Sequence, residues 1–256
     1  MGIVGSIKKG FSVAASSFPV VLVLFVFGFI FNLINQKIAP QTPNTPPSPQ
    51  MIVAGVAFIL ATVYMQAGSM GYARDKIKEG AATLSRFTGS AAKFYVKILL
   101  LSLIIAAIIG AFVLLAAFVV AMLGQTAHIV ALIIAGAITI VGVFVLILLF
   151  FAPYIAVNEN KPVGACLSDS VKTVRANLWK VLLISLILIA IGFLVGVLIG
   201  LVVGLVSRAV QNAPVTSILF AFLSSLVNAF LGFFVTATFM SFYLGLSAQA
   251  PAEIKS

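Results

Sequence analysis

Charged residues are scarce in this chain of 256 residues. Only 8% of the residues are charged and 62% are hydrophobic, whereas a soluble domain typically carries about 25% charged residues. A soluble fold of this length could not hide so much apolar surface, because domains of this size still expose much of theirs to water. The apolar residues also form runs longer than the ~18 residues that indicate a bilayer-spanning helix. The composition therefore predicts an integral membrane protein.

Cysteine and histidine are each present once, as Cys166 and His128. One cysteine excludes an internal disulfide, and structural zinc sites need several ligands of these types. The sequence also lacks a Gly-x-Ser-x-Gly nucleophile elbow and a phosphate-binding Gly-x-x-x-x-Gly-Lys-Ser/Thr loop. We therefore expect no catalytic residues, no cofactor, no metal and no enzymatic activity.

Long apolar runs predict six transmembrane helices, with boundaries good to a few residues. The runs cover residues 18–36, 51–72, 98–123, 129–153, 181–206 and 215–246. No Asp, Glu, Lys or Arg lies deep in any of them. Because ionisable residues inside the membrane usually mark ion-coupled transport, an ion-driven carrier is not expected.

Basic residues are divided unequally between the two sides of the predicted membrane. Counting along alternating loops places 13 of the 15 Lys and Arg residues on one side and only Lys37 and Arg208 on the other. All five acidic residues also fall on the first side, which leaves it a net charge of +8. Since Lys and Arg collect in cytoplasmic loops, this side is predicted to be cytoplasmic, with both termini, in a multi-pass protein of the cell membrane.

The segments before the first, third and fifth spans share an amphipathic pattern. Apolar residues recur at helical spacing in residues 3–18, 77–94 and 163–178, opposite a polar face. Basic amphipathic helices beside a span are expected to lie in the membrane interface. Residues 97–104 also match residues 180–187 nearly letter by letter.

This pattern predicts an all-α integral membrane fold with an internal threefold repeat. The six transmembrane helices would form three parallel hairpin repeats, each preceded by a cytoplasmic amphipathic helix. The predicted repeat units are residues 1–73, 74–157 and 158–247. Together they form a single six-helix membrane domain, residues 1–247, followed by a cytoplasmic tail, residues 248–256.

Small and polar residues occupy defined places in the spans. The fifth span carries a glycine at every fourth position, at Gly192, Gly196, Gly200 and Gly204. Such a face is typical of close helix packing, and it would also suit self-association or a pore lining. Six further residues are expected to bridge helices rather than to line a polar path: Asn32, Asn35, Gln66, Asn228, Thr236 and Thr238.

Seven basic residues of the predicted inner segments form the candidate binding set: Arg74, Lys76, Lys78, Arg86, Lys93, Lys172 and Arg175. Each would attract anionic lipid at about 1 kcal/mol per charge. The same residues would suit the phosphates of nucleic acid. The sequence leaves both uses open.

Residues 151–159, which read FAPYIAVNE, continue through Ala165, Ser170, Arg175 and Asn177 into the fifth span. This stretch resembles a family of six-span prokaryotic proteins similar to the membrane domain of glycerophosphodiester phosphodiesterases. The shared elements are an aromatic-x-Pro end of the fourth span, an acid just beyond it, and an Ala…Ser…Arg/Asn helix. The resemblance implies no catalytic residue, because the phosphodiesterase is a separate domain.

Size, span count and basic inner helices are also similar to those of the polytopic subunit of the crenarchaeal DNA-import system. We therefore expect a non-enzymatic component of a transport or translocation assembly, with DNA import as its sharpest form. Its partners would be the lipid bilayer, other membrane subunits or a second copy, and nucleic acid at the cytoplasmic basic surface. The alternative is a lipid-handling or membrane-organising protein of the inner leaflet. An intramembrane enzyme is disfavoured, because no acid/base pair is visible.

Overall fold

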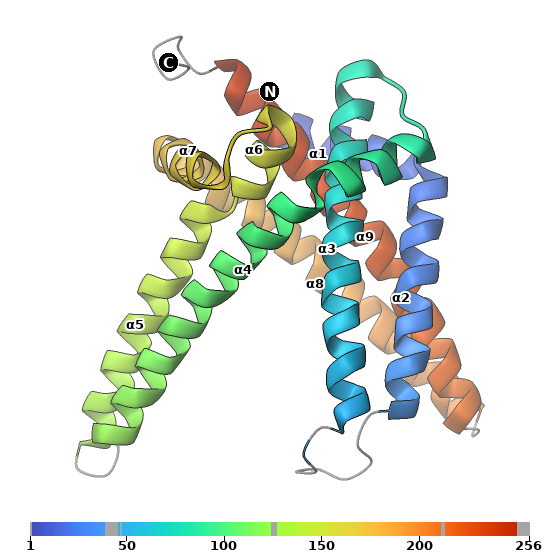
Figure 1. The fold of residues 1–256 in the computed structure, drawn as a ribbon. Coiled ribbons are helices and arrows are strands. Elements are labelled where there is room, and N and C mark those ends of the chain that lie inside the picture. The colour runs from blue at the N-terminus through green and yellow to red at the C-terminus, as the bar shows by residue number, and fades with distance from the viewer. Residues whose placement is uncertain (1, 39–45, 47, 124–126, 211–212, 250–256) are drawn as a thin grey trace. The chain divides into compact units, whose positions relative to one another are not determined.

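The computed structural model describes residues 2–38, 46, 48–123, 127–210 and 213–249. Most of the predicted cytoplasmic tail, residues 250–256, lies outside this part of the chain. Within the described residues the structure contains nine α-helices and no strand (Figure 1). The helices are α1 (Ile3–Ala15), α2 (Phe18–Ile38), α3 (Pro49–Glu79), α4 (Leu84–Leu123), α5 (His128–Leu149), α6 (Ala152–Glu159), α7 (Val163–Ala176), α8 (Leu178–Ala209) and α9 (Ala213–Gln249).

Six helical segments of the described chain are long and apolar enough to cross a membrane. They are Phe18–Ile38, Pro49–Glu79, Leu84–Leu123, His128–Glu159, Leu178–Arg208 and Val215–Ala248. These segments contain the six apolar runs, so the prediction of an all-helical fold with six helices long and apolar enough to span a membrane is confirmed for the described residues. Several helices exceed the ~20 residues that a ~30 Å hydrocarbon core requires, because they continue into polar sequence at their ends.

Local sequence explains where the helices begin and end. At the start of α3, the Ser48 hydroxyl accepts a hydrogen bond from the Met51 N–H at 3.2 Å, and Pro49 occupies the first turn. The helix ends at Gly80, whose φ of 78° is left-handed and favours glycine. Asn160 ends α6 in the same conformation, with φ 55°.

The segment before the third span differs from its expected form. We expected a separate amphipathic helix there, but α4 is continuous from Leu84 to Leu123. α4 has no break along its length. By contrast, Ser16 and Ser17 separate α1 from α2, and Asn177 separates α7 from α8. The expected segment is therefore divided between the end of α3, a short connection and the first turns of α4.

The chain forms two compact units. Unit 1 comprises residues 1–93 and 179–256, and unit 2 comprises residues 94–178. In unit 1, α9 packs against α1, α2 and α3, and α2 lies beside α3 (Figure 1). The Asn32 amide donates a hydrogen bond to the Ser225 hydroxyl at 2.8 Å and so joins α2 to α9. This is one of the polar bridges expected between spans.

Unit 2 is built from a helical hairpin and a helix that crosses its end. Gly142 of α5 allows Phe112 of α4 to approach closely, since an added Cβ would lie 3.0 Å from the Phe112 ring. The helical segment that begins as α5 is interrupted at Phe150 and Phe151 and continues as α6, with Pro153 in its first turn. α7 packs against both α5 and α6.

Candidate functional site

α1 contacts α9 in unit 1 through a face of small residues. Ser6, Gly10, Val13 and Ala14 are its buried residues. A Cβ added at Gly10 would lie 2.1 Å from the Thr238 Oγ1 and 2.7 Å from the Thr238 Cα, so only glycine fits this crossing. Beside this small face, the Phe11 ring packs edge-on against the Phe230 and Phe234 rings of α9, at centroid distances of 6.0 and 6.2 Å.

Large apolar side chains of this segment are nevertheless exposed over much of their surface. Val4 and Phe11 of α1 are 64% and 55% exposed, and Phe18 at the start of α2 is 70% exposed. In water such a set would be costly, but the same surface is suited to the acyl-chain boundary of a membrane. α1 therefore packs against α9 and still presents Val4 and part of Phe11 to an apolar environment.

The start of α4 crosses the end of α3 at two further glycines. A Cβ at Gly71 would lie 2.2 Å from the Ser90 Cβ, and one at Gly68 would lie 2.9 Å from the Phe87 ring. Phe87 and Ser90 are both buried. The two helices consequently approach each other closely just before the polar end of α3.

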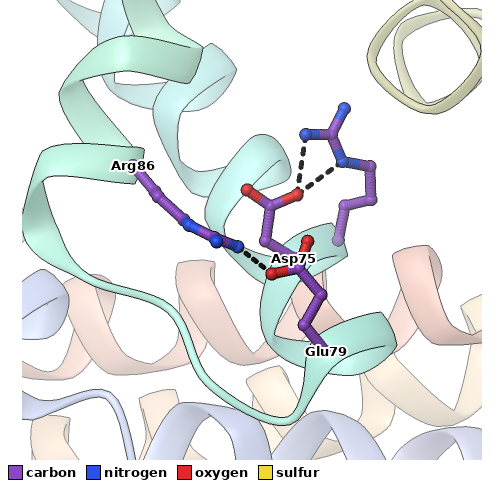
Figure 2. A network of polar contacts seen from close by, with 4 residues as sticks. Asp75, Glu79 and Arg86 are labelled. Carbon is purple, nitrogen blue, oxygen red and sulfur yellow. Dashed lines mark hydrogen bonds and ion pairs between the residues drawn. The ribbon is translucent and has the colours of Figure 1, made fainter.

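Charged residues gather at that polar end (Figure 2). Arg74 contacts the buried Asp75 carboxylate through its Nε at 2.8 Å and its Nη2 at 2.7 Å. Arg86, from the first turn of α4, pairs with Glu79 across the connection between the helices. Removing a carboxylate from water is costly unless a cation accompanies it, and Arg74 fulfils that need for Asp75.

Lys76 joins α3 to the end of α1. Its Nζ donates hydrogen bonds to the Ser16 carbonyl oxygen at 2.5 Å and to the Ser17 hydroxyl at 3.1 Å. The last turn of α1 contains no basic residue of its own. A cation at a helix C-terminus offsets the partial negative charge of the unpaired carbonyl groups, so Lys76 stabilises α1 from outside.

In unit 2, the Ser170 hydroxyl repairs the break between α5 and α6. It donates to the Leu148 carbonyl at 2.8 Å and accepts from the Phe151 N–H at 3.1 Å. Both backbone groups lie where the regular helical pattern is interrupted. Because buried backbone groups must be paired, one hydroxyl on α7 makes this interruption possible.

The connection between α6 and α7 is held by cations. Lys161 pairs with Glu159 and Asp169 at 2.8 Å each, and the hydrogen bond that Lys161 donates to the Asp169 carboxylate is the main reason that the Lys161 pKa is raised. Lys97 donates to the Asn160 carbonyl and side-chain oxygens at 2.8 and 2.7 Å. Cys166 is buried beside this connection, and burial raises the pKa of its thiol. These contacts fix the start of α7.

The seven basic residues of the candidate binding set are divided between the two units. Arg74, Lys76, Lys78, Arg86 and Lys93 belong to unit 1, whereas Lys172 and Arg175 belong to unit 2. Arg74, Arg86 and Lys76 bind groups of the chain itself. Lys172 and Arg175 lie exposed on α7. The contacts of these residues show that some of the predicted binding residues also hold the fold together.

The glycine stripe of α8 makes no close packing within the described chain. Apart from the neighbouring turns of α8 itself, no heavy atom of unit 1 lies within 4 Å of a Cβ built at Gly192, Gly196, Gly200 or Gly204. This contrasts with Gly10 and Gly71, which other helices approach closely. α8 also supplies the least buried of the six spans.

Unit 1 contains an apolar groove of about 540 Å³ that the sequence analysis did not identify. It is lined by three elements: the start of α1, the start of α8 and the end of α9. The lining residues are Gly2, Ile3, Val4, Gly5, Lys180, Leu183, Ile187, Phe242 and Leu246. The one sequence signal was the spacing of Lys180, Leu183 and Ile187, which places them on one helix face. The contributions of α1 and α9 are too distant in sequence to be recognised.

The described residues contain no group of three or more His, Cys, Asp or Glu side chains that could hold a metal ion. What they do contain is a set of six apolar spans, with the short helices α1 and α7 directly before the first and fifth of them. This architecture is that of a multi-pass α-helical membrane protein.

The family of the chain follows from its sequence over nearly the whole length. A family model described as "Domain of unknown function (DUF7847)" matches residues 1–246, and the chain belongs to this family. No curated protein and no solved structure matched the chain.

Proposed function

We propose that the chain is a non-enzymatic multi-pass subunit of a transport or translocation assembly in the cell membrane. The observation that carries this proposal is the open glycine stripe on α8, the least buried span. In lipid, helices associate through close packing rather than through the hydrophobic effect, and small residues permit that approach. The stripe is therefore the face at which another subunit, or a second copy of the chain, docks.

The proposed orientation places both termini in the cytoplasm. It is supported by the 13 basic residues that fall on that side, against Lys37 and Arg208 on the other. In this orientation the Lys76 contact, the Glu79–Arg86 pair and the Lys161 ion pairs lie at the cytoplasmic ends of the spans.

A threefold repeat is the architecture that we propose for this subunit. The start of α4 crosses α3, the span directly before it, and α7 packs against α5 and α6, which form the span before α7. α1 has no preceding span, and it packs against α9, the last one. Gly10, Gly71 and Ser170 stand at these three contacts. The recurrence supports three hairpin units, each with a short amphipathic segment in the cytoplasmic interface.

DNA import is the sharpest form of the proposal. Lys172 and Arg175 on α7 are the first residues that we assign to phosphate contacts, because both are exposed. Arg74, Lys76 and Arg86 are second choices, since each contacts a group of the chain. Contacts of this kind guide a nucleic acid without reading its sequence.

A lipid-handling or membrane-organising role is the second candidate. The observation that favours it is α1, whose Val4 and Phe11 are exposed while Lys8 is exposed on the same short helix. These three residues, at positions i, i+4 and i+7, share one face of the helix. A helix with such a face would press its apolar side chains into the inner leaflet, while the lysine attracts anionic lipid.

Affinity purification in a mild detergent, with the bound proteins, lipids and nucleic acid identified, tests the proposal. We expect stoichiometric recovery of other membrane subunits or of a second copy, and loss of this partner in the double variant Gly196→Leu/Gly200→Leu. Because no other helix of unit 1 lies near these positions, the variant should keep its own fold. A matched variant, Leu194→Ala/Leu198→Ala, alters exposed positions of α8 outside the stripe and should retain the partner.

The same purification separates the finer forms. Nucleic acid that is recovered with the native chain and lost in Lys172→Gln/Arg175→Gln supports DNA import. Recovery of the chain alone with anionic lipid would contradict the translocation proposal and favour the membrane-organising role.

A further inference from the structure

The groove at the start of α8 runs from a polar rim into an apolar interior. Lys180 lies at the rim, and Leu183, Ile187, Phe242 and Leu246 form the apolar lining. Lys180 and Ile187 are seven residues apart on one helix, which corresponds to about 10 Å along its axis. The volume of about 540 Å³ is in the range of sites that hold small molecules.

The position of the rim indicates where the groove meets the lipid. Trp179 directly precedes Lys180 and is 82% exposed. An exposed tryptophan next to a lysine at the end of a span is typical of the head-group level of a bilayer. The groove therefore begins at that level and extends toward the acyl chains.

The charge around the rim is positive. Lys180 supplies a full positive charge, and the first residues of α1, Ile3, Val4 and Gly5, line the same groove. The first turn of α1 contains no acidic residue, and no side chain caps it. Its unpaired N–H groups add a partial positive charge to that of Lys180.

We infer that this groove binds one anionic membrane phospholipid. An acyl chain lies along Leu183, Ile187, Phe242 and Leu246, and the phosphate lies between Lys180 and the start of α1. The pairing of an apolar lining with a cationic rim is complementary to a lipid that carries a negative head group and an apolar tail. This inference holds whether or not α8 packs against another subunit, because the groove and the glycine stripe use different residues.

Native mass spectrometry of the full chain, released from vesicles of equal parts phosphatidylglycerol and phosphatidylcholine, tests the inference. We expect one retained lipid per chain, with phosphatidylglycerol strongly preferred. The variant Lys180→Gln should weaken the retention of phosphatidylglycerol about fivefold, as expected for the loss of one lysine contact. Ile187→Trp fills the groove and should abolish retention of this lipid.

Two control variants show whether the effects are specific to the groove. Leu186→Trp adds the same bulk at a position of α8 that is 63% exposed and does not line the groove. Lys37→Gln removes an exposed lysine from the last turn of α2, away from the residues that line the groove. Both should retain phosphatidylglycerol as the native chain does. Equal retention of the two lipids by the native chain would overturn the inference. Full retention of phosphatidylglycerol by an Ile187→Trp variant that has the same unfolding temperature as the native chain would also overturn it.

Discussion

Ser170 illustrates how a single hydroxyl allows an interruption in a long apolar segment. It pairs with both the Leu148 carbonyl and the Phe151 N–H at the point where α5 gives way to α6. All three residues are buried, so neither backbone group has water as a substitute. The contact therefore connects α7 to the α5–α6 break at the level of individual atoms.

We predict that Ser170→Ala destabilises unit 2 by about 1–3 kcal/mol, the range for leaving buried polar groups unpaired. The free energy of unfolding in a detergent titration measures this effect. Ser168→Ala, an exposed position on the same helix, is the control and should change stability little. Equal stability of the two variants would show that the Ser170 contacts do not hold α7.

Glycines in the helices have two different roles, and the space available for an added Cβ atom distinguishes them. At Gly10 it would meet the backbone of Thr238, which cannot move aside as a flexible side chain would. At Gly192 the added Cβ would meet no heavy atom of unit 1 within 4 Å beyond the neighbouring turns of α8. The first glycine is required by the fold, whereas the second is available for contact outside the chain.

At the scale of the helix, we predict that Gly10→Ala destabilises the chain by about 1–3 kcal/mol, as overpacking usually does. Gly192→Ala should leave stability unchanged or raise it slightly, because alanine favours the helix more than glycine does. Thermal unfolding in detergent, followed by circular dichroism, compares the two variants. A stable Gly10→Ala variant would mean that α1 does not pack against α9 as described.

The helices themselves were largely predictable from the sequence, and their contacts were not. Apolar runs of bilayer length identify spans because the membrane requires length and apolarity from each helix independently. The partners of Gly10, Gly71 and Ser170 depend on residues that lie elsewhere in the chain, so no local pattern reveals them. The structural roles of Arg74, Lys76 and Arg86 were missed for the same reason, since their basic character alone also suits lipid or phosphate.

Across the whole molecule, the spans differ in how much of their surface other helices bury. α9 has the most buried span and packs against three other helices of unit 1, whereas α8 has the least buried span and an open glycine stripe. Bulky side chains on a membrane helix pack well against lipid, whereas a face of glycines packs most closely against another helix. We therefore place the contact with a further subunit on α8.

Cysteine cross-linking in native membranes tests this claim most directly. In a Cys166→Ala background, which removes the only native cysteine, Gly200→Cys is compared with Leu198→Cys on the opposite face of α8. The account predicts a cross-linked product with another subunit, or with a second copy, from position 200 and little or none from position 198. Equal cross-linking from both positions, or none from position 200, would contradict the claim that the glycine stripe is an assembly surface.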